Sequence, residues 1–242
     1  MISEQTVPKR RAAIMRALSL VRDEVRLGVG SGSTMSSFLE ELSKGLSSGA
    51  RRVKVVPTSS QVEVECSMLG LELSSLYDDP KLRFVVDSAD EVDEKGNLLK
   101  GGGAALTREK IVHASAETAV IIAEEEKVVK ELGERHSLPI EVMPFALPLV
   151  IREVKALFSV DPVIRRVPGK AGPLVTDNGN YVLDVPLGRM VDLSGTHLRL
   201  KAIPGVVETG LFPSKKGFLV VGTSQGVKVV ETRGGLGGRG RW

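Results

Sequence analysis

Residue types that can do chemistry concentrate in one short stretch of the chain. Asp87 and Asp90 follow an apolar segment, Lys100 precedes the consecutive glycines 101–103, and Glu109 comes shortly after them. Carboxylates three residues apart can converge on one ligand, and consecutive glycines allow a backbone to approach that ligand closely. A glutamate one or two helix turns further on can transfer a proton. This stretch therefore predicts a catalytic site.

A glycine-rich loop is the second candidate. The sequence Gly28-Val29-Gly30-Ser31-Gly32-Ser33-Thr34 follows an apolar segment and opens a helical pattern. Backbone N–H groups at a helix start bind anions, and the Ser33 and Thr34 hydroxyls can add donors. The loop lacks the third glycine of a dinucleotide fingerprint and the Gly-Lys-Ser/Thr of a Walker loop. Taken alone, it fits an anion site and a plain capped strand-to-helix turn equally well.

Two further groups can reach the same place. The segment Pro57-Thr58-Ser59-Ser60-Gln61 follows the next predicted strand, and alone it favours helix capping. Lys127 follows a later strand, and alone it is typical of a helix-surface charge. Ligands of parallel sheets gather at the carboxyl ends of the strands, so the position of both groups matters.

The elements that must position these residues alternate along the first half of the chain. Strands are predicted at 25–30, 53–56, 82–86 and 119–123, and helices at 6–21, 34–46, 60–69, 104–116 and 124–132. Strands that are apolar throughout, with a helix between each, indicate a mostly parallel sheet covered on both faces. We predict an α/β fold with a doubly wound, Rossmann-like sheet.

The pattern changes near residue 133. Helices are predicted at 148–158 and 198–203, strands at 163–167, 181–185, 206–211 and 218–221, and a hairpin turn at Asp177-Asn178-Gly179-Asn180. We interpret 133–207 as a smaller inserted α+β (ferredoxin-like) domain, and 1–132 with 208–231 as the catalytic domain. The Gly/Arg-rich residues 232–242 are predicted to be a disordered tail, and RNA binding by this tail is the less favoured alternative.

Composition limits the class of protein. The 242 residues are 42% hydrophobic and 26% charged, which is ordinary for a soluble globular chain. The net charge of +3 gives no support to a nucleic acid or membrane partner. The single Cys66 excludes an intrachain disulfide and suits the cytoplasm. We find no signal peptide and no apolar run long enough to cross a bilayer, so we expect a cytoplasmic protein.

The histidines suggest no metal site. His113, His136 and His197 lack metal-ligand spacing, and none lies beside Cys66 in the sequence. We interpret all three as structural or surface residues and expect no metal. The absence of a Ser-His-Asp or Cys-His arrangement leaves nucleophilic hydrolysis with little support.

In order along the chain, eight motifs resemble the type A ribose-5-phosphate isomerase family. The resemblance covers residues 7–231. The motifs are the glycine loop 28–34, Asp87-Ser88-Ala89-Asp90-Glu91-Val92-Asp93, Leu99-Lys100-Gly101-Gly102-Gly103, Arg108-Glu109-Lys110-Ile111, Glu126-Lys127, Thr176-Asp177-Asn178-Gly179-Asn180-Tyr181, Ala202-Ile203-Pro204-Gly205-Val206-Val207-Glu208 and Gly210-Leu211-Phe212.

The resemblance implies an isomerase that interconverts ribose 5-phosphate and ribulose 5-phosphate in the non-oxidative pentose phosphate pathway, with no metal or organic cofactor. Its partner would be a small sugar phosphate, and it would be a homodimer or homotetramer. Glu109 falls at the family's proton-acceptor position. The implied binding residues are Ser31, Gly32, Ser33 and Thr34 for the phosphate, Asp87, Ser88, Ala89, Asp90, Lys100, Gly101, Gly102 and Gly103 for the sugar, and Lys127 as a cationic contact.

This chemistry fits the residue types. Aldose–ketose exchange needs a base that removes a proton from C2 and returns one to C1 through a cis-enediolate. One carboxylate such as Glu109 can do both, and does so best when its pKa is raised toward neutrality. Lys100 and the glycine N–H groups would stabilise the oxyanion. Asp87 would assist ring opening by proton transfer to or from the ring oxygen or the anomeric hydroxyl.

The chain departs from the family at two positions. Ser31 stands where the family often has threonine, which keeps the hydroxyl. Ser88 stands where it usually has glycine, and a positive φ there would cost about 1–2 kcal/mol.

One alternative is a sugar-phosphate-binding regulatory sensor domain, since fold does not fix function. A sensor needs no base and usually has a helix-turn-helix segment, for which the chain has no room before its first strand. A coenzyme A transferase is a weaker alternative, because nothing suggests nucleotide recognition.

Overall fold

The strands of the first half join two strands from near the C-terminal end, β13 and β14, in a seven-stranded sheet with the order β14-β13-β7-β4-β1-β2-β3. The computed structural model describes residues 6–21, 25–46 and 53–234. Neighbouring strands are parallel except for the antiparallel pair β13 and β14. The strands are β1 (Arg26–Val29), β2 (Lys54–Pro57), β3 (Glu72–Leu73), β4 (Leu82–Ser88), β7 (Ala116–Glu124), β13 (Lys216–Thr223) and β14 (Gly226–Arg233). The predicted mostly parallel sheet is confirmed.

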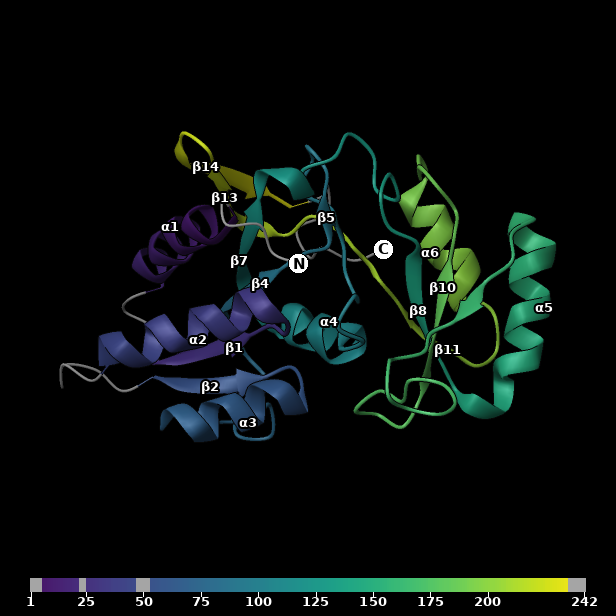
Figure 1. Ribbon diagram of the computed structural model, residues 1–242, viewed down its shortest axis with the longest axis horizontal. Helices are drawn as coiled ribbons and strands as arrows, with labels where there is room; N and C mark the ends of the chain where they lie inside the picture. The colour runs from purple at the N-terminus through teal and green to yellow at the C-terminus, as the bar shows by residue number, and fades with distance from the viewer. Residues whose placement is uncertain (1–5, 22–24, 47–52, 235–242) are drawn as a thin grey trace. The chain divides into compact units, whose positions relative to one another are not determined.

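Helices cover both faces of this sheet because strand side chains alternate between the faces. On one face, Leu27 and Val29 of β1 join a core with α1 (Thr6–Leu20), α2 (Ser33–Leu46) and α3 (Ser60–Leu69) (Figure 1). Gly28 lies between them and faces α4 (Leu106–Ser115) on the opposite side, because a Cβ atom on Gly28 would lie 2.6 Å from Cγ1 of Val112. The doubly wound arrangement is therefore present.

Capping residues set the ends of α3. Ser59 is extended, and its side chain accepts a hydrogen bond from the Val62 N–H, as an N-cap should. Gly70 has φ of 67°, the left-handed conformation that ends many helices at low cost when the residue is glycine. The helix spans the residues 60–69 predicted from the sequence.

The chain forms two compact units, and the second consists of Asp90–Thr107 and Val129–Pro213 among the described residues. Its main sheet has the order β11-β8-β10-β9 and is antiparallel. The elements follow one another as β8 (Leu138–Val142), α5 (Leu147–Phe158), β9 (Val163–Ile164), β10 (Tyr181–Val185), α6 (Leu193–Lys201) and β11 (Val206–Thr209). This β-α-β-β-α-β order is that of a ferredoxin-like fold, as predicted.

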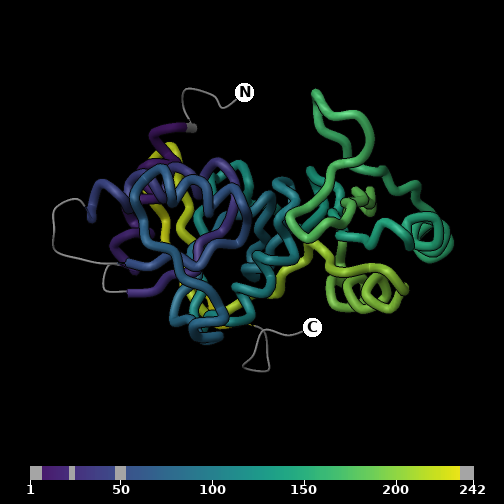
Figure 2. Tube along the Cα trace, turned by 90° about the horizontal axis from the view of Figure 1, so that it is seen from below, coloured from purple at the N-terminus to yellow at the C-terminus, as the bar shows by residue number. Residues whose placement is uncertain are grey.

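Both helices of this unit pack on one face of its sheet. Ile140 of β8 forms a core with Val150 of α5 and Leu200 of α6, and Figure 2 shows the two helices side by side. Glu141, the next residue of β8, faces the other side. The side chain of Glu141 is buried, and it accepts hydrogen bonds from Thr107, Thr176, Asn178 and Asn180. Much of the turn motif at 176–180 therefore serves to bind a buried carboxylate.

A second buried carboxylate ties together segments of this unit that are far apart in sequence. Glu91 is fully buried and accepts hydrogen bonds from the backbone N–H groups of Gly133, Arg135 and His136, each at 2.7 Å. A buried carboxylate needs such donors, because without them its desolvation costs several kcal/mol. Glu91 thus anchors the turn at 133–136.

The boundaries between the two units differ from the domain boundaries predicted from the sequence. The predicted small domain is 133–207, whereas 90–107, 129–132 and 208–213 also belong to the second unit. The reason is a small sheet in the order β12-β6-β5, in which β5 (Glu91–Val92) and β6 (Leu98–Leu99) join β12 (Leu211–Phe212). The first unit comprises the described residues within Met1–Ala89, Arg108–Val128 and Ser214–Gly240.

The helix predicted at 124–132 and the predicted start of the C-terminal tail are both wrong. The helix predicted at 124–132 is only a 3₁₀ turn, η1 (Glu125–Lys127), because Val128 is extended and Val129 N–H donates to Val92 O. The predicted tail begins at residue 232, yet Thr232 and Arg233 extend β14. Residues 235–242 of that tail lie outside the described residues.

Candidate functional site

The candidate site of the first unit lies where the chain changes direction across the sheet. From β1 the chain proceeds to β2 and β3 on one side, whereas β4 and β7 lie on the other side of β1. Such a switch point leaves a crevice at the carboxyl ends of the two strands, which is where open α/β sheets bind ligands. The loop 30–34 follows β1 there, and Asp87 lies at the end of β4 beside it, with Gly30 N–H donating to Val86 O at 2.9 Å.

The glycine-rich loop has the geometry of an anion site. Gly32 has φ of +97°, which favours glycine. Its carbonyl accepts the first helical hydrogen bonds of α2, from Met35 and Ser36, so Ser33 and Thr34 form the first turn. Their N–H groups precede the first intrahelical bond and point along the helix axis toward the loop. Ser33 is exposed, while Thr34 is buried.

The Ser31 hydroxyl holds two loops together. It lies 2.8 Å from Thr58 Oγ1 and donates to Ser59 Oγ at 2.7 Å. Thr58 in turn donates to Val29 O at 3.0 Å, and Gln61 Oε1 accepts from Gly32 N–H at 3.1 Å. The segment 57–61 therefore caps α3, as its sequence favours, and also supports the glycine-rich loop, which sequence reasoning missed.

Asp87 is completely buried at the end of β4. Its Oδ1 accepts from Ser88 N–H at 2.7 Å, and its Oδ2 lies 2.8 Å from His113 Nε2. Ser88 is the last residue of β4, and its φ is not positive. The backbone strain that a serine would suffer at a positive φ therefore does not arise here. Ala89 follows Ser88, still belongs to the first unit and is also buried.

Glu109 lies in the first turn of α4 and reaches the loop after β1. Its side chain is buried, and its Oε1 accepts from Ser31 N–H at 3.3 Å. The close packing of Val112 on Gly28 brings α4 near enough for this contact. The structure thus brings together the predicted base and the predicted phosphate loop.

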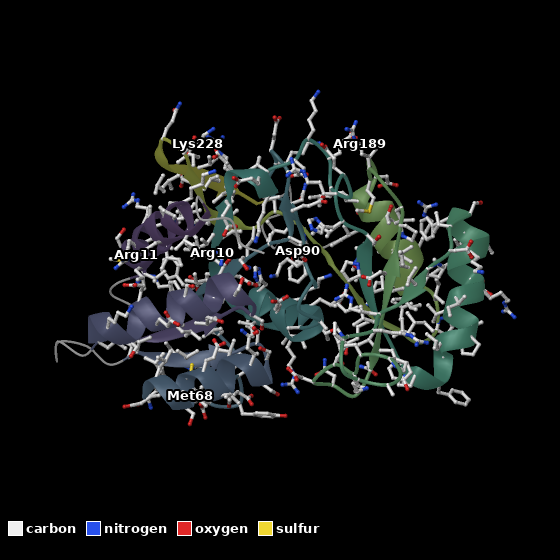
Figure 3. The ribbon with its side chains drawn as sticks, viewed as in Figure 1. Arg10, Arg11, Met68, Asp90, Arg189 and Lys228 are labelled. Atoms are coloured by element: carbon white, nitrogen blue, oxygen red, sulfur yellow. The ribbon has the colours of Figure 1, made fainter. Side chains whose placement is uncertain are left out.

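Lys127 belongs to a group of charges at the end of β7. Its Nζ lies 3.3 Å from Glu124 Oε2, while Arg10, labelled in Figure 3, donates to Glu124 Oε1 at 2.6 Å. Burial raises the pKa of Glu124, but Lys127 and Arg10 outweigh burial and leave this pKa below its usual value. Arg10 Nη1 also lies 3.5 Å from Ser33 Oγ, so this cluster reaches the glycine-rich loop.

The other predicted residues belong to the second unit. Asp90 Oδ2 accepts from Gly102 N–H at 2.8 Å. Arg165 donates to the carbonyls of Gly101 and Gly102. Lys100 is buried, with its Nζ 5.7 Å from the centre of the Phe212 ring. Gly102 and Gly103 are exposed.

His113 is the residue of this site to which the sequence assigns no chemical role. Its spacing suggests only a structural or surface position, and it is buried against Asp87. A signal exists, because His113 follows Glu109 by four residues, and residues four apart lie on one helix face.

Metal clusters and membrane-spanning helices are both absent from the described residues. No three His, Cys, Asp or Glu side chains gather there in an arrangement that could hold a metal ion. None of the helices in the described ranges is long and apolar enough to span a bilayer.

Comparison with known proteins places the chain in one family. Residues 54–226 match the family model of ribose 5-phosphate isomerase A (phosphoriboisomerase A). Ribose-5-phosphate isomerase A of Bradyrhizobium diazoefficiens is 41% identical over 232 residues, which cover 93% of this chain and 95% of that protein.

Solved structures agree. Ribose 5-phosphate isomerase A of Methanocaldococcus jannaschii has a TM-score of 0.86 at 35% identity, covering 93% of this chain and 98% of that one. A D-ribose-5-phosphate isomerase in complex with phospho-erythronic acid has a TM-score of 0.89 at 36% identity, with the same coverage of both chains. A mostly parallel sheet with its switch point between β1 and β4, a ferredoxin-like second unit and this degree of identity lead to one conclusion: the chain belongs to the ribose 5-phosphate isomerase A family.

Proposed function

We propose that this protein interconverts ribose 5-phosphate and ribulose 5-phosphate, with Glu109 as the group that moves the proton between C2 and C1. The observation that supports this most is the contact of Glu109 Oε1 with Ser31 N–H at the switch point of the sheet. It joins a carboxylate base to a loop suited to phosphate, and an isomerase of phosphorylated sugars needs both. A sensor would need only the loop.

The loop after β1 binds the phosphate. The backbone N–H groups at the start of α2 and the Ser33 and Thr34 hydroxyls donate to the phosphate oxygens, while Ser31 and Gly32 shape the loop. Lys127 adds positive charge, and it lies in the same charge cluster as Arg10, which approaches Ser33. Anchoring the phosphate holds C1 and C2 at the base, so binding energy remote from the reacting carbons lowers the barrier.

Sugar binding is assigned by the family resemblance. In the first unit, the residues that bind the sugar are Asp87, Ser88 and Ala89, at the carboxyl end of β4. The resemblance also assigns Asp90, Lys100 and the glycines 101–103 to the sugar. The fixed conformation of this glycine turn, with Gly102 N–H bound to Asp90, suits a rigid wall for a small ligand.

The reaction then proceeds in three steps. Asp87 assists the opening of the furanose ring. Glu109 removes the proton from C2, and the negative charge that develops on the cis-enediolate is stabilised by Lys100 and glycine N–H groups. Glu109 finally returns a proton to C1, while a proton passes from O2 to O1, which leaves the ketone at C2.

The ligand of a related structure is consistent with such an intermediate. Phospho-erythronic acid is the bound molecule in the D-ribose-5-phosphate isomerase of 36% identity. It combines a phosphate with a planar, negatively charged carboxylate, and a cis-enediolate of a sugar phosphate has the same two features. A site built for the enediolate therefore suits this acid.

We also propose that the protein acts in the cytoplasm as a homodimer or homotetramer, with a small sugar phosphate as its partner and with no nucleic acid or membrane partner. This follows from the family resemblance together with the single buried Cys66 and the small net charge.

The deciding experiment measures ribulose 5-phosphate formation from ribose 5-phosphate, with a chelator present, by the wild type and by Glu109→Gln. We expect turnover in the wild type and a loss of about 10²–10⁴-fold in the variant, since only the proton transfer is removed. Calorimetry should show that the variant still binds ribose 5-phosphate. Glu117→Gln, which removes an exposed carboxylate of β7, is the matched control and should retain full activity.

Two outcomes would overturn the proposal. Binding of ribose 5-phosphate by the wild type with no turnover would favour the sensor alternative. Normal turnover in Glu109→Gln would assign the proton transfer to another group.

A further inference from the structure

His113 contacts the carboxylate of Asp87, which is proposed to be catalytic. His113 lies on α4, the helix that also carries the proposed base Glu109. Its Nε2 lies 2.8 Å from Asp87 Oδ2, and His113 is 7% exposed while Asp87 is 0% exposed. The other oxygen of Asp87 accepts from Ser88 N–H. Each oxygen of the buried carboxylate is therefore engaged, one by the backbone of its own strand and one by α4.

Helix α4 positions both carboxylates of the site, that of Glu109 directly and that of Asp87 through His113. Glu109 and His113 are four residues apart, so they lie one turn apart on the same helix face. The first turn brings Glu109 to Ser31 N–H, and the next brings His113 to Asp87. A single rigid helix thus positions the base directly and positions Asp87 through an imidazole.

Asp87 needs such a partner for physical reasons. A buried carboxylate is costly unless charged or hydrogen-bonding groups compensate for its lost hydration. Its side chain also lies in a narrow space, because a Cβ atom on Gly30 would lie 1.8 Å from Oδ1. The backbone of Gly30 therefore restricts the movement of Oδ1, and His113 contacts Oδ2, the other oxygen.

We propose that His113 is a positioning residue that holds the Asp87 carboxylate in place for opening of the furanose ring. The proposal rests on the proposed function. In that step Asp87 takes the proton from the anomeric hydroxyl O1, the C1–O4 bond breaks as the C1=O1 bond forms, and the same proton passes to O4. His113 touches no substrate atom and acts only through Asp87, as a partner that orients a catalytic group.

Ring opening can be measured apart from proton transfer between C1 and C2. Ribulose 5-phosphate has no furanose form, because the oxygen that would close its ring bears the phosphate. Glu109 can therefore exchange the C1 proton of ribulose 5-phosphate with solvent through the enediolate, with no ring to open or close. A residue that serves only ring opening should leave this exchange intact.

The test compares the two reactions in one preparation of each protein. Conversion of ribose 5-phosphate is measured by assay, and deuterium incorporation at C1 of ribulose 5-phosphate in heavy water is followed by NMR. For His113→Ala we expect conversion to fall about 10- to 100-fold, the usual penalty of misplacing a catalytic group, while exchange stays at the wild-type rate. The ratio of the two rates does not depend on how much of the variant is folded.

Further variants test the contact with Asp87. His113→Gln keeps an N–H donor near Oδ2 and should recover part of the conversion rate. In an Asp87→Asn background, His113→Ala should add little further loss, because residues that act through one another are non-additive. His197→Ala is the matched control, since that histidine pairs with Thr209 Oγ1 at 2.8 Å in the second unit, and its rate ratio should not change.

The outcomes separate this proposal from the proposed function. An equal loss of both reactions in His113→Ala, or no loss of either, would overturn the positioning role. Full additivity with Asp87→Asn would do the same. If the wild type performs neither reaction, the isomerase function itself is wrong.

Discussion

Gly30 makes room for Asp87. A Cβ atom at residue 30 would lie 1.8 Å from Oδ1 and 2.1 Å from Cγ of the Asp87 side chain. Gly30 does not have a positive φ, so glycine is needed here for space rather than for backbone conformation. Of the three glycines in the glycine-rich loop, only Gly32 has a positive φ.

Replacing Gly30 by alanine should therefore damage the site more than the fold. We expect Gly30→Ala to lower kcat/KM by about 10- to 100-fold, because the added methyl displaces the Asp87 carboxylate. Steady-state kinetics and thermal unfolding of the variant measure the two effects. Gly45→Ala is the control, because that exposed glycine of α2 has open space around it and should gain up to about 1 kcal/mol of stability. Wild-type kinetics in Gly30→Ala would refute this account of the glycine.

The first turn of α2 should control substrate affinity. Removing both hydroxyls in Ser33→Ala/Thr34→Ala should raise KM at least about tenfold, since hydrogen bonds to charged groups contribute about 1.5–3 kcal/mol each. The value of kcat should change less, because the base is untouched. Ser37→Ala, one turn further along the same helix, is the matched control. A double variant with unchanged KM would remove these hydroxyls from the phosphate site.

The charge cluster at the end of β7 should make stability depend on pH. The folded-state pKa of Glu124 lies below its usual value of 4.5, so its contribution is fully present above 4.5 and is lost as the pH falls through the folded value. We expect Glu124→Gln to lower the free energy of unfolding by about 1–3 kcal/mol at neutral pH.

Denaturant unfolding from neutral pH to about pH 2 checks this prediction. The difference between Glu124→Gln and the wild type should shrink as the solution becomes more acidic. Glu117→Gln, at an exposed position of the same strand, should show little difference at any pH. A constant difference across the range would mean that the carboxylate charge of Glu124 is not what stabilises the protein.

Cys66 should be unreactive in the folded protein. Burial, with a smaller contribution from Glu65, raises the pKa of its thiol to about 11, and the side chain is fully buried. Because the thiolate is the reactive form, we expect no alkylation of the native chain at mildly alkaline pH and one equivalent after denaturation. Mass spectrometry of the alkylated protein measures both. Rapid labelling of the native protein would show that α3 opens readily.

Much of the first unit could be predicted from its sequence because its signals are local. The strands near 27, 55, 84 and 120 are apolar throughout, and α3 has Ser59 and Gly70 at its ends. The placement of Asp87 and the glycine-rich loop follows from the same reasoning, since both lie at the carboxyl ends of parallel strands.

The features that escaped prediction depend on contacts between distant residues. Most residues of 124–132 are good helix formers, yet Val129 N–H donates to Val92 O and the helix stops at a single 3₁₀ turn. Residues 90–107 look continuous with the first domain, but β5 and β6 form a sheet with β12, more than a hundred residues later. His113 shows no motif, and only the fold reveals that it contacts Asp87.

The position of β13 in the sheet has a consequence for synthesis of the chain. Strand β7 lies between β4 and β13, and β13 is made almost a hundred residues after it (Figure 1). On the ribosome, β7 therefore has one edge without its native partner while the whole of the ferredoxin-like sheet is being produced. That sheet draws on residues 138–209 alone, so it can form first. Exposed strand edges favour misassociation, so the nascent protein is most vulnerable during the interval before residues 216–223 emerge.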